Sequence, residues 1–399
     1  MAALPRRQAL TLATAVTLLT TTRANAQPHN APGVTDTEIK IGQSMPYSGP
    51  ASAYGQLGRV EAAYFAWINQ HGGINGRKIT LISVDDGYSP PKAVEQMRKL
   101  VEEDQVAAIF NVLGTPINMA VRKYLNAKKV PHLFIAAGSP NFADPEHYPW
   151  TIGWQPTLTT EAKFYAAHVL ASTPDAKIAV LYQNDDFGKG LLDGLKSGLG
   201  DKAEAMIIAA ASYEATDPTI DSQIVTLQAT GADTLFLFTY AKQGAQAIRK
   251  AADLGWKPTR YIHLGAASVA ATFQPAGLDK SAGILTAGFI KDPSDPQWAD
   301  DPDQKAWRAW MTENLPGADL TDSINVAGYS YAQTLEQVLR QCGNDLSREN
   351  IMRQATSLHD FRLPMLLPGS LINTSPTDYR VITYVKLQRF NGTSWDFVS

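Results

Sequence analysis

Cysteine is almost absent from this chain of 399 residues, which has only Cys342. A lone thiol forms no intramolecular disulfide and supplies no cysteine-based zinc site. An excess of charge of one sign is also absent, because 38 Asp and Glu face 35 Lys and Arg for a formal net charge of −3. This balance argues against nucleic-acid binding driven by the net charge of the whole protein. The apolar fraction of 44% and the charged fraction of 18% are those of a soluble globular protein, and the length predicts about two domains.

Signatures of enzymatic chemistry are missing as well. The sequence has no Walker phosphate loop, no nucleophile elbow and no His-Glu-x-x-His motif. Its seven histidines show no ligand spacing, and His132 and His263 stand in strand contexts typical of packed or strand-end residues. We therefore predict no bound metal, no cofactor and no enzymatic activity.

Two short motifs could suggest chemistry, but each has a structural explanation that fits better. The glycines of 188–194 resemble a dinucleotide fingerprint, yet the preceding Asp185 and Asp186 would repel a pyrophosphate, which favours a capped helix start. Asp85 and Asp86 are neighbours on a predicted strand. Neighbouring side chains on a strand point to opposite faces, so these two carboxylates do not converge for hydrolysis.

Long hydrophobic runs are absent except near the N-terminus. There, an arginine pair at 6–7 precedes an apolar, Thr-rich run over 9–19, and residues 24–26 read Ala-Asn-Ala. This order is that of a secretory signal peptide, and the run is too short for a membrane-spanning helix. We predict a signal peptide over 1–26, cleaved after Ala26, and a periplasmic protein. General secretion and twin-arginine export both stay open.

The rest of the chain alternates between short apolar runs and longer amphipathic stretches, after a tail over 27–35 that we expect to be flexible. Continuous apolar runs suit parallel strands covered on both faces by helices, and two successive blocks of this kind predict two doubly wound α/β lobes. The predicted strands are 39–43, 79–84, 107–112, 132–135, 178–182, 205–211, 234–239, 261–264 and 283–289. The predicted helices are 57–70, 91–103, 119–127, 161–171, 190–198, 220–230 and 243–254.

The C-terminal quarter has a different character. Helical patterns cover 303–314, 322–341 and 347–357. An alternating pattern over 379–390 predicts a strand, and the following Asn-Gly is a strong signal for a hairpin turn.

Three loops rich in small and hydroxyl residues follow predicted strands, at 45–55, 113–118 and 136–140. In open α/β sheets, ligands bind beyond the carboxyl ends of the strands. The loops contain no arginine, so an anion bound there would meet N–H and O–H dipoles and helix N-termini. Such a site suits the carboxylate of a small organic molecule, although ordinary turns would explain the same spacing.

Four motifs occur in an order and spacing that match a known family: Gly-Pro at 49–50, Tyr-Gly at 54–55, GGINGRKI at 72–79 and DDFG at 185–188. With them, the chain resembles the periplasmic solute-binding proteins of the branched-chain amino acid (leucine/isoleucine/valine-binding) type, over about residues 34–398. These proteins serve ATP-driven ABC uptake transporters.

The resemblance implies the type I periplasmic binding protein fold, in which two α/β lobes joined by three crossovers close on a ligand by hinge motion. Residues 36–153 with about 290–370 would form the N-terminal lobe, and 154–289 with about 371–399 the C-terminal lobe. The crossovers would fall near 153–155, 287–290 and 368–377.

The resemblance also implies roles for single residues. A hydroxyl and amides at Gly114 and Thr115, with others at Gly138 and Ser139, would hold the ligand carboxylate. Further cleft positions carried over from the family are Tyr54, which would wall the cleft, Trp154 at the first hinge, Phe187, Tyr240 and Gly265.

One departure from the family pattern concerns an amino group on the ligand. The resemblance implies an acidic residue in the loop at 265–268, where this chain reads Gly-Ala-Ala-Ser. A buried ammonium without a counter-charge costs several kcal/mol, so the sequence favours an acid that lacks an amine. Asp185 or Asp186, turned inward, would restore the amino acid as a ligand.

We therefore expect an exported, monomeric, non-enzymatic binding protein that delivers a small carboxylate-bearing solute to the membrane permease of an ABC transporter. The solute is an aromatic or aliphatic organic acid, or a branched-chain or other hydrophobic amino acid. The alternative is a soluble ligand-binding partner of a membrane sensor. An extracellular hydrolase would need a convergent nucleophile and base, and the sequence offers no such pair.

Overall fold

The computed structural model describes residues 30–398. The predicted signal peptide, 1–26, and its cleavage site lie outside this range. Among the residues described, no helix has the length and apolar character needed to cross a membrane.

The N-terminal tail differs from its prediction where the structure describes it, from residue 30 onward. Instead of being free, it is bound to the body of the protein. The amide of Ala31 donates to the carbonyl of Leu346 (3.1 Å), and the amide of Lys40 donates to the carbonyl of Gly33 (2.9 Å).

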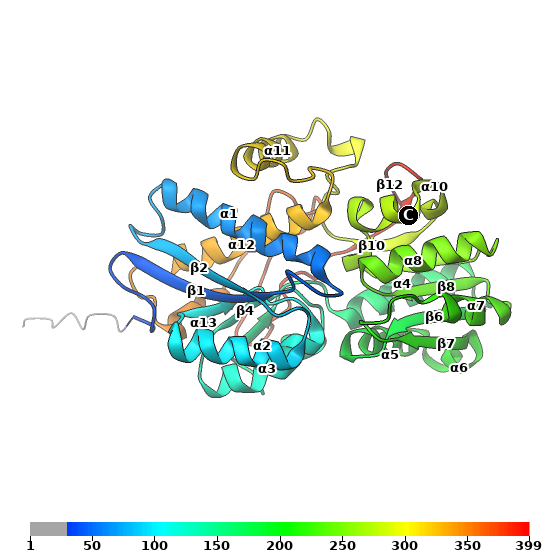
Figure 1. The fold of residues 1–399 in the computed structure, drawn as a ribbon, viewed down its shortest axis with the longest axis horizontal. Coiled ribbons are helices and arrows are strands. Elements are labelled where there is room, and N and C mark those ends of the chain that lie inside the picture. Colours follow the sequence, from blue (N-terminus) through cyan, green and yellow to red (C-terminus); the bar gives the residue numbers. More distant parts are fainter. Residues whose placement is uncertain (1–29, 399) are drawn as a thin grey trace, which may run out of the picture.

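Two separate sheets confirm the predicted pair of α/β lobes (Figure 1). The first sheet is entirely parallel, and its order places the earliest strands of the chain near one edge. In spatial order its strands are β2 (Lys78–Asp85), β1 (Glu38–Met45), β3 (Ala108–Phe110), β4 (His132–Ile135) and β5 (Thr151–Gly153).

Helices pack on both faces of this first sheet, as apolar runs of buried parallel strands require. The helices of this lobe are α1 (Gln56–Gln70), α2 (Pro90–Arg98), α3 (Thr115–Ala127), α11 (Pro302–Asn314), which lies outside α1, α12 (Ser323–Gln341) and α13 (Arg348–Ala355). α1 packs against α12, and α2 packs against α3 on the other face. The late helices thus complete the lobe that residues 30–153 begin.

The second sheet has a parallel body and an antiparallel edge. In spatial order its strands are β12 (Trp395–Phe397), β11 (Lys386–Phe390), β10 (Leu285–Gly288), β9 (Thr259–Ile262), β8 (Thr234–Phe238), β6 (Ile178–Gln183) and β7 (Ile207–Tyr213). Its helices are α4 (Leu158–Ser172), α5 (Asp186–Leu199), α6 (Ala203–Met206), α7 (Asp221–Ala229), α8 (Ala241–Asp253), α9 (Gln274–Ala276) and α10 (Leu278–Ser281). The predicted hairpin is present, because β11 and β12 pair antiparallel around Asn391 and Gly392.

The chain passes between the lobes after β5, after β10 and before β11. The first two passages follow Gly153 and Gly288, the residues that end β5 and β10. The third lies later than 368–377, since Ile372 still pairs with Phe361 and the hydroxyl of Tyr379 donates to the carbonyl of Pro149 (3.1 Å) in the first lobe. We therefore propose that the C-terminal part of the second lobe begins near residue 386 rather than near 371.

The start of α5 confirms the capped helix that we preferred to a dinucleotide site. The Asp185 carboxylate accepts from the amides of Phe187 (3.0 Å) and Gly188 (3.2 Å). A side chain at Gly188 would collide with the carbonyl oxygen of Gln183, so this glycine serves the close approach of helix and strand.

Candidate functional site

A narrow cleft, partly open to solvent, lies between the two lobes. Loops at the carboxyl ends of the strands of both sheets meet there, as expected for an open α/β sheet. The lining residues are Tyr54, Leu57, Leu113, Thr115, Ala136, Ala137, Gly138, Gln155, Leu158, Phe187, Tyr240, His263, Leu264, Gly265, Phe289, Ile290, Ser323, Ile324, Ala327 and Tyr331. They are mostly apolar, with a few hydroxyls, one amide and one imidazole.

Thr115 brings a hydroxyl to the first-lobe wall of the cleft, at the N-terminus of α3. The turn that places it needs Gly114, whose φ of 98° is unfavourable for a residue with a side chain. Thr115 is fully buried, and its Oγ1 has no hydrogen-bond partner among the residues described. Buried hydroxyls are normally satisfied, so this one is free for a group that enters the cleft.

The loop after β4 supplies backbone donors beside that hydroxyl. Within residues 30–398, the amides of Ala137 and Gly138 donate to no protein acceptor. The carbonyl of Gly138 accepts from the amide of Leu158 (2.6 Å), and a Cβ on Gly138 would lie 2.5 Å from the carbonyl oxygen of Pro156. The glycine therefore holds this loop against the start of α4 and keeps its amides at the cleft.

Aromatic rings form the opposite wall. Phe187, from the first turn of α5, stacks on Tyr240 with ring centroids 4.6 Å apart and planes at 8°. Tyr54 meets Tyr240 edge to face at 5.2 Å. Burial raises the pKa of Tyr54 and of Tyr240 well above the ordinary value, so both hydroxyls stay protonated.

Hydrogen bonds from Tyr54 cross the cleft and hold the lobes close together. The Tyr54 hydroxyl, from the first lobe, donates to the carbonyl of Gly265 (2.9 Å) and accepts from the amide of Ala241 (3.1 Å) in the second lobe. The structure therefore shows a conformation in which the two lobes are in contact with each other.

Further bonds cross between the lobes outside the cleft lining, among them two between side chains. The Nε2 of Gln183 donates to the hydroxyl of Tyr88 (3.2 Å), and the Oγ of Ser268 donates to Asp322 (2.9 Å). Burial raises the pKa of Asp322, whose carboxylate also caps α12 through the amide of Ile324. We call these two bonds the interlobe bridges.

His263 lines the cleft, whereas the sequence suggested only a packed or strand-end role. It stands just after β9, and its Nδ1 lies 2.8 Å from the Oε2 of Glu161, a fully buried residue of α4. Glu161 also accepts from the amide of Leu264 (2.8 Å). The Glu161 partner could not be found from sequence, because 102 residues separate the two side chains.

The structure brings together most of the residues proposed for the site, but three of them do not line the cleft. Gly114 turns the chain behind Thr115, and the hydroxyl of Ser139 caps a short helix by accepting from the amide of Asn141 (3.4 Å). Trp154 is wholly buried in the first-lobe core. Its ring packs on Tyr331 at 4.2 Å, and its Nε1 donates to Thr334 (3.0 Å).

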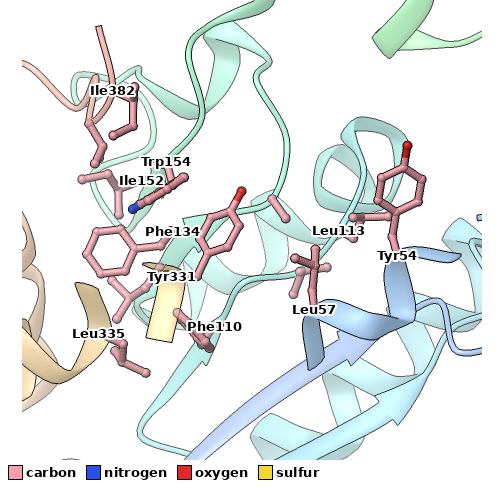
Figure 2. Close-up of a cluster of buried hydrophobic side chains, with 14 of the residues drawn as sticks. Tyr54, Leu57, Phe110, Leu113, Phe134, Ile152, Trp154, Tyr331, Leu335 and Ile382 are labelled. Carbon is pink, nitrogen blue, oxygen red and sulfur yellow. The ribbon is translucent and has the colours of Figure 1, made fainter. Parts of the chain in front are cut away.

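Figure 2 shows this separation, with Trp154 beside Tyr331 and Phe134, and with Tyr54, Leu57 and Leu113 in a group apart. Tyr331 stands between Trp154 and the cleft, so the tryptophan supports the wall and does not form it. Strand-based reasoning missed Tyr331 because it belongs to α12, far along the chain.

No Asp, Glu, Lys or Arg is found among the described residues that line the cleft. Asp185, considered as a counter-charge for an ammonium, is instead occupied by the cap of α5 and by the Nε2 of Gln183 (2.5 Å). Nor does any group of His, Cys, Asp and Glu within residues 30–398 have an arrangement that could hold a metal ion. The cleft thus presents neutral dipoles, aromatic faces and the Glu161–His263 pair.

Comparison with known proteins places these features in a family. The model of a family described as periplasmic binding protein matches residues 38–394. Over 331 residues, 81% of this chain and 83% of the relative, the chain is 24% identical to the "Leu/Ile/Val-binding protein homolog 3" of Brucella melitensis.

Two solved structures have the same fold. A branched-chain amino acid ABC transporter protein from Thermus thermophilus with bound valine superposes with a TM-score of 0.81, at 14% identity over 92% of this chain and 96% of that one. A fatty acid ABC transporter substrate-binding protein from Thermomonospora curvata has a TM-score of 0.79, at 22% identity over 93% and 94%. These relatives are binding proteins rather than enzymes, in agreement with the prediction. The chain therefore belongs to the periplasmic binding protein family.

Proposed function

We propose that this protein captures a small carboxylate-bearing solute between its lobes and delivers it to the permease of an ABC transporter. The solute is an aromatic or aliphatic organic acid, or a hydrophobic amino acid. Thr115 and the amides of Ala137 and Gly138 would receive the carboxylate, while Tyr54 and the Phe187–Tyr240 pair would enclose the organic part.

The observation that carries the proposal is the unpartnered, fully buried hydroxyl of Thr115 at the N-terminus of α3. A helix N-terminus and free amides favour an anion without any fixed positive charge. An otherwise apolar lining with a few placed polar groups is the usual composition of a small-molecule site.

Substitution of Thr115 by valine tests the assignment, because valine keeps the shape and removes the donor. Hydrogen bonds to charged groups contribute about 1.5–3 kcal/mol, so the affinity for acids should fall about 10- to 150-fold. A thermal-shift screen of hydrophobic amino acids, aromatic acids and aliphatic acids finds the ligand, and calorimetry then measures its affinity for both proteins.

Thr272→Val is the matched control. Thr272 is also fully buried with an unpartnered Oγ1, but it lies outside the cleft lining. The control should bind like the parent protein. Equal affinity in Thr115→Val and Thr272→Val would contradict the proposed carboxylate site.

Delivery to a permease is tested in cells. Deletion of the gene should abolish uptake of the solute identified by the screen, and restoration of the parent chain should restore it. Normal uptake together with loss of a solute response would instead favour the membrane sensor as the partner.

A further inference from the structure

The Glu161–His263 pair gives the second-lobe wall its strongest polar group. His263 is only 4% exposed, and what remains accessible borders the cleft. Its Nδ1 faces the Glu161 carboxylate, at 2.8 Å from Oε2 and 3.1 Å from Oε1. Its Nε2 has no hydrogen-bond partner within the described part of the chain.

Glu161 determines which nitrogen of the ring carries the proton. A carboxylate only accepts, so Nδ1 must be the N–H that donates to it, and in the neutral ring Nε2 is then an acceptor. The amide of Leu264 donates to the same carboxylate, which holds its Oε1 in place. With the ring neutral, the pair therefore presents a fixed acceptor at Nε2, with the Glu161 carboxylate directly behind it.

Gly265 leaves this acceptor uncovered. A Cβ at residue 265 would lie 2.7 Å from Nε2 of His263 and 3.2 Å from its Cδ2. Any larger residue would cover the edge of the ring or displace it. The glycine stands in the loop where the sequence offered no carboxylate, and its lack of a side chain keeps Nε2 open to the cleft.

We propose that His263, oriented by Glu161, selects solutes that carry a hydroxyl or an ammonium group in addition to their carboxylate. This rests on the proposed function, since it concerns the second polar group of the same ligand. A hydroxyl or ammonium donates to Nε2, and an ammonium also gains from the Glu161 charge behind the ring. His263 is the residue that contacts the ligand, and Glu161 is a positioning residue.

The test compares acids that differ only in one substituent. The probes are 3-phenylpropanoate and 4-methylpentanoate, each with hydrogen, hydroxyl, amino or keto at the α-carbon, and 3-(4-hydroxyphenyl)propanoate for a hydroxyl on the ring. Calorimetry on the full mature chain should show at least tenfold tighter binding of a hydroxyl or amino form than of the matching parent and keto acids. The substituted acid that binds most tightly, amino or hydroxyl, identifies the ligand group that donates to Nε2 of His263.

Two variants separate the role of the pair from general packing. In His263→Leu, the ratio between the preferred form and its parent acid should fall to within about twofold. In Glu161→Gln, the amide of Leu264 and the hydroxyl of Tyr165 hold the new carbonyl oxygen, and the negative charge behind the ring is lost. The preference for the hydroxyl or amino form should then fall while the affinity for the parent acid is kept, an effect that a merely structural role of Glu161 would not produce.

Each result decides one way. A parent protein that prefers the keto or unsubstituted acid, or a ratio unchanged in His263→Leu, overturns the selection by His263 while leaving the carboxylate site intact. Should neither series bind in any form, the proposed function itself fails. If thermal unfolding shows that one variant is not folded, the affinity ratios of the parent protein and of the other variant still test the selection by His263.

Discussion

Burial of one carboxyl group gives the stability of this protein a pH dependence. Asp292 follows β10 and accepts from the amide and hydroxyl of Ser294 (2.8 and 2.6 Å) and from Nε1 of Trp395 (3.1 Å). Despite these donors, burial raises its pKa to about 6. The folded protein therefore holds this proton more tightly than the unfolded chain.

The free energy of unfolding should consequently fall as pH rises through the window from about 4 to about 6, by up to about 3 kcal/mol from this group. Stability falls rather than rises with pH because the folded state binds more protons than the unfolded chain within that window. The side chain in Asp292→Asn cannot titrate, so the free energy of unfolding of this variant should fall less across the window than that of the parent protein. Urea unfolding at pH 4, 5, 6 and 7 measures both slopes, and equal slopes would refute the assignment.

Helix-to-helix packing in the second lobe depends on two glycines of α5. A Cβ on Gly198 would meet the Cβ of Ala166 at 2.6 Å and the Cα of Lys163 at 3.0 Å, and one on Gly194 would meet Ala162 at 2.9 Å. The α4 and α5 backbones therefore approach more closely than side chains would allow.

Gly198→Ala should destabilise the protein by about 1–3 kcal/mol through overpacking, although alanine by itself is about 1 kcal/mol better in a helix. Gly190→Ala is the control on the same helix, because its Cβ would meet only the movable Cδ1 of Leu158, at 3.2 Å. Denaturant unfolding should show a loss of stability in Gly198→Ala and little change or a gain of stability in Gly190→Ala. A stabilised Gly198→Ala would mean that the helices separate easily.

The helices and strands also show how much of the fold could be predicted from the sequence. Apolar runs and caps predicted the two lobes because buried parallel strands and helix starts are local signals. The helix predicted from Met119 begins at Thr115, because Gly114 and the following proline form a helix start that periodicity does not report. The strand predicted over 379–390 covers only Lys386–Phe390, since Tyr379 contacts the first lobe and tertiary placement overrides β-propensity.

The candidate site was less predictable than the fold. Thr115, Phe187, Tyr240 and Gly265 were named because they follow strands or match family motifs, and they do line the cleft. Trp154 was named for its place at a hinge, yet the orientation of its side chain is decided by packing on Tyr331 from a helix far along the chain.

At the scale of the whole molecule, the interlobe bridges favour the closed arrangement without lining the cleft. Tyr88→Phe removes the bond from Gln183 and keeps the ring that packs edge to face on Tyr240 at 5.6 Å. A neutral hydrogen bond contributes about 1 kcal/mol, so ligand affinity should fall about fivefold, with faster release. Stopped-flow release kinetics and calorimetry measure the two effects.

Tyr379→Phe provides the comparison. It also removes a tyrosine hydroxyl bond, but that bond, to the carbonyl of Pro149, stays within one lobe. Its affinity should match that of the parent. Equal affinity in both variants would show that the bond from Gln183 does not contribute to closure.

The single cysteine makes this hinged molecule simple to convert into an optical reporter. Cys342 is buried at the end of α12, and burial raises the pKa of its thiol to about 12, so it reacts slowly with alkylating dyes. A new surface cysteine at the rim of each lobe would therefore be labelled without background from the native thiol. Energy transfer between the two dyes would then report closure directly in solution, before the natural solute is identified.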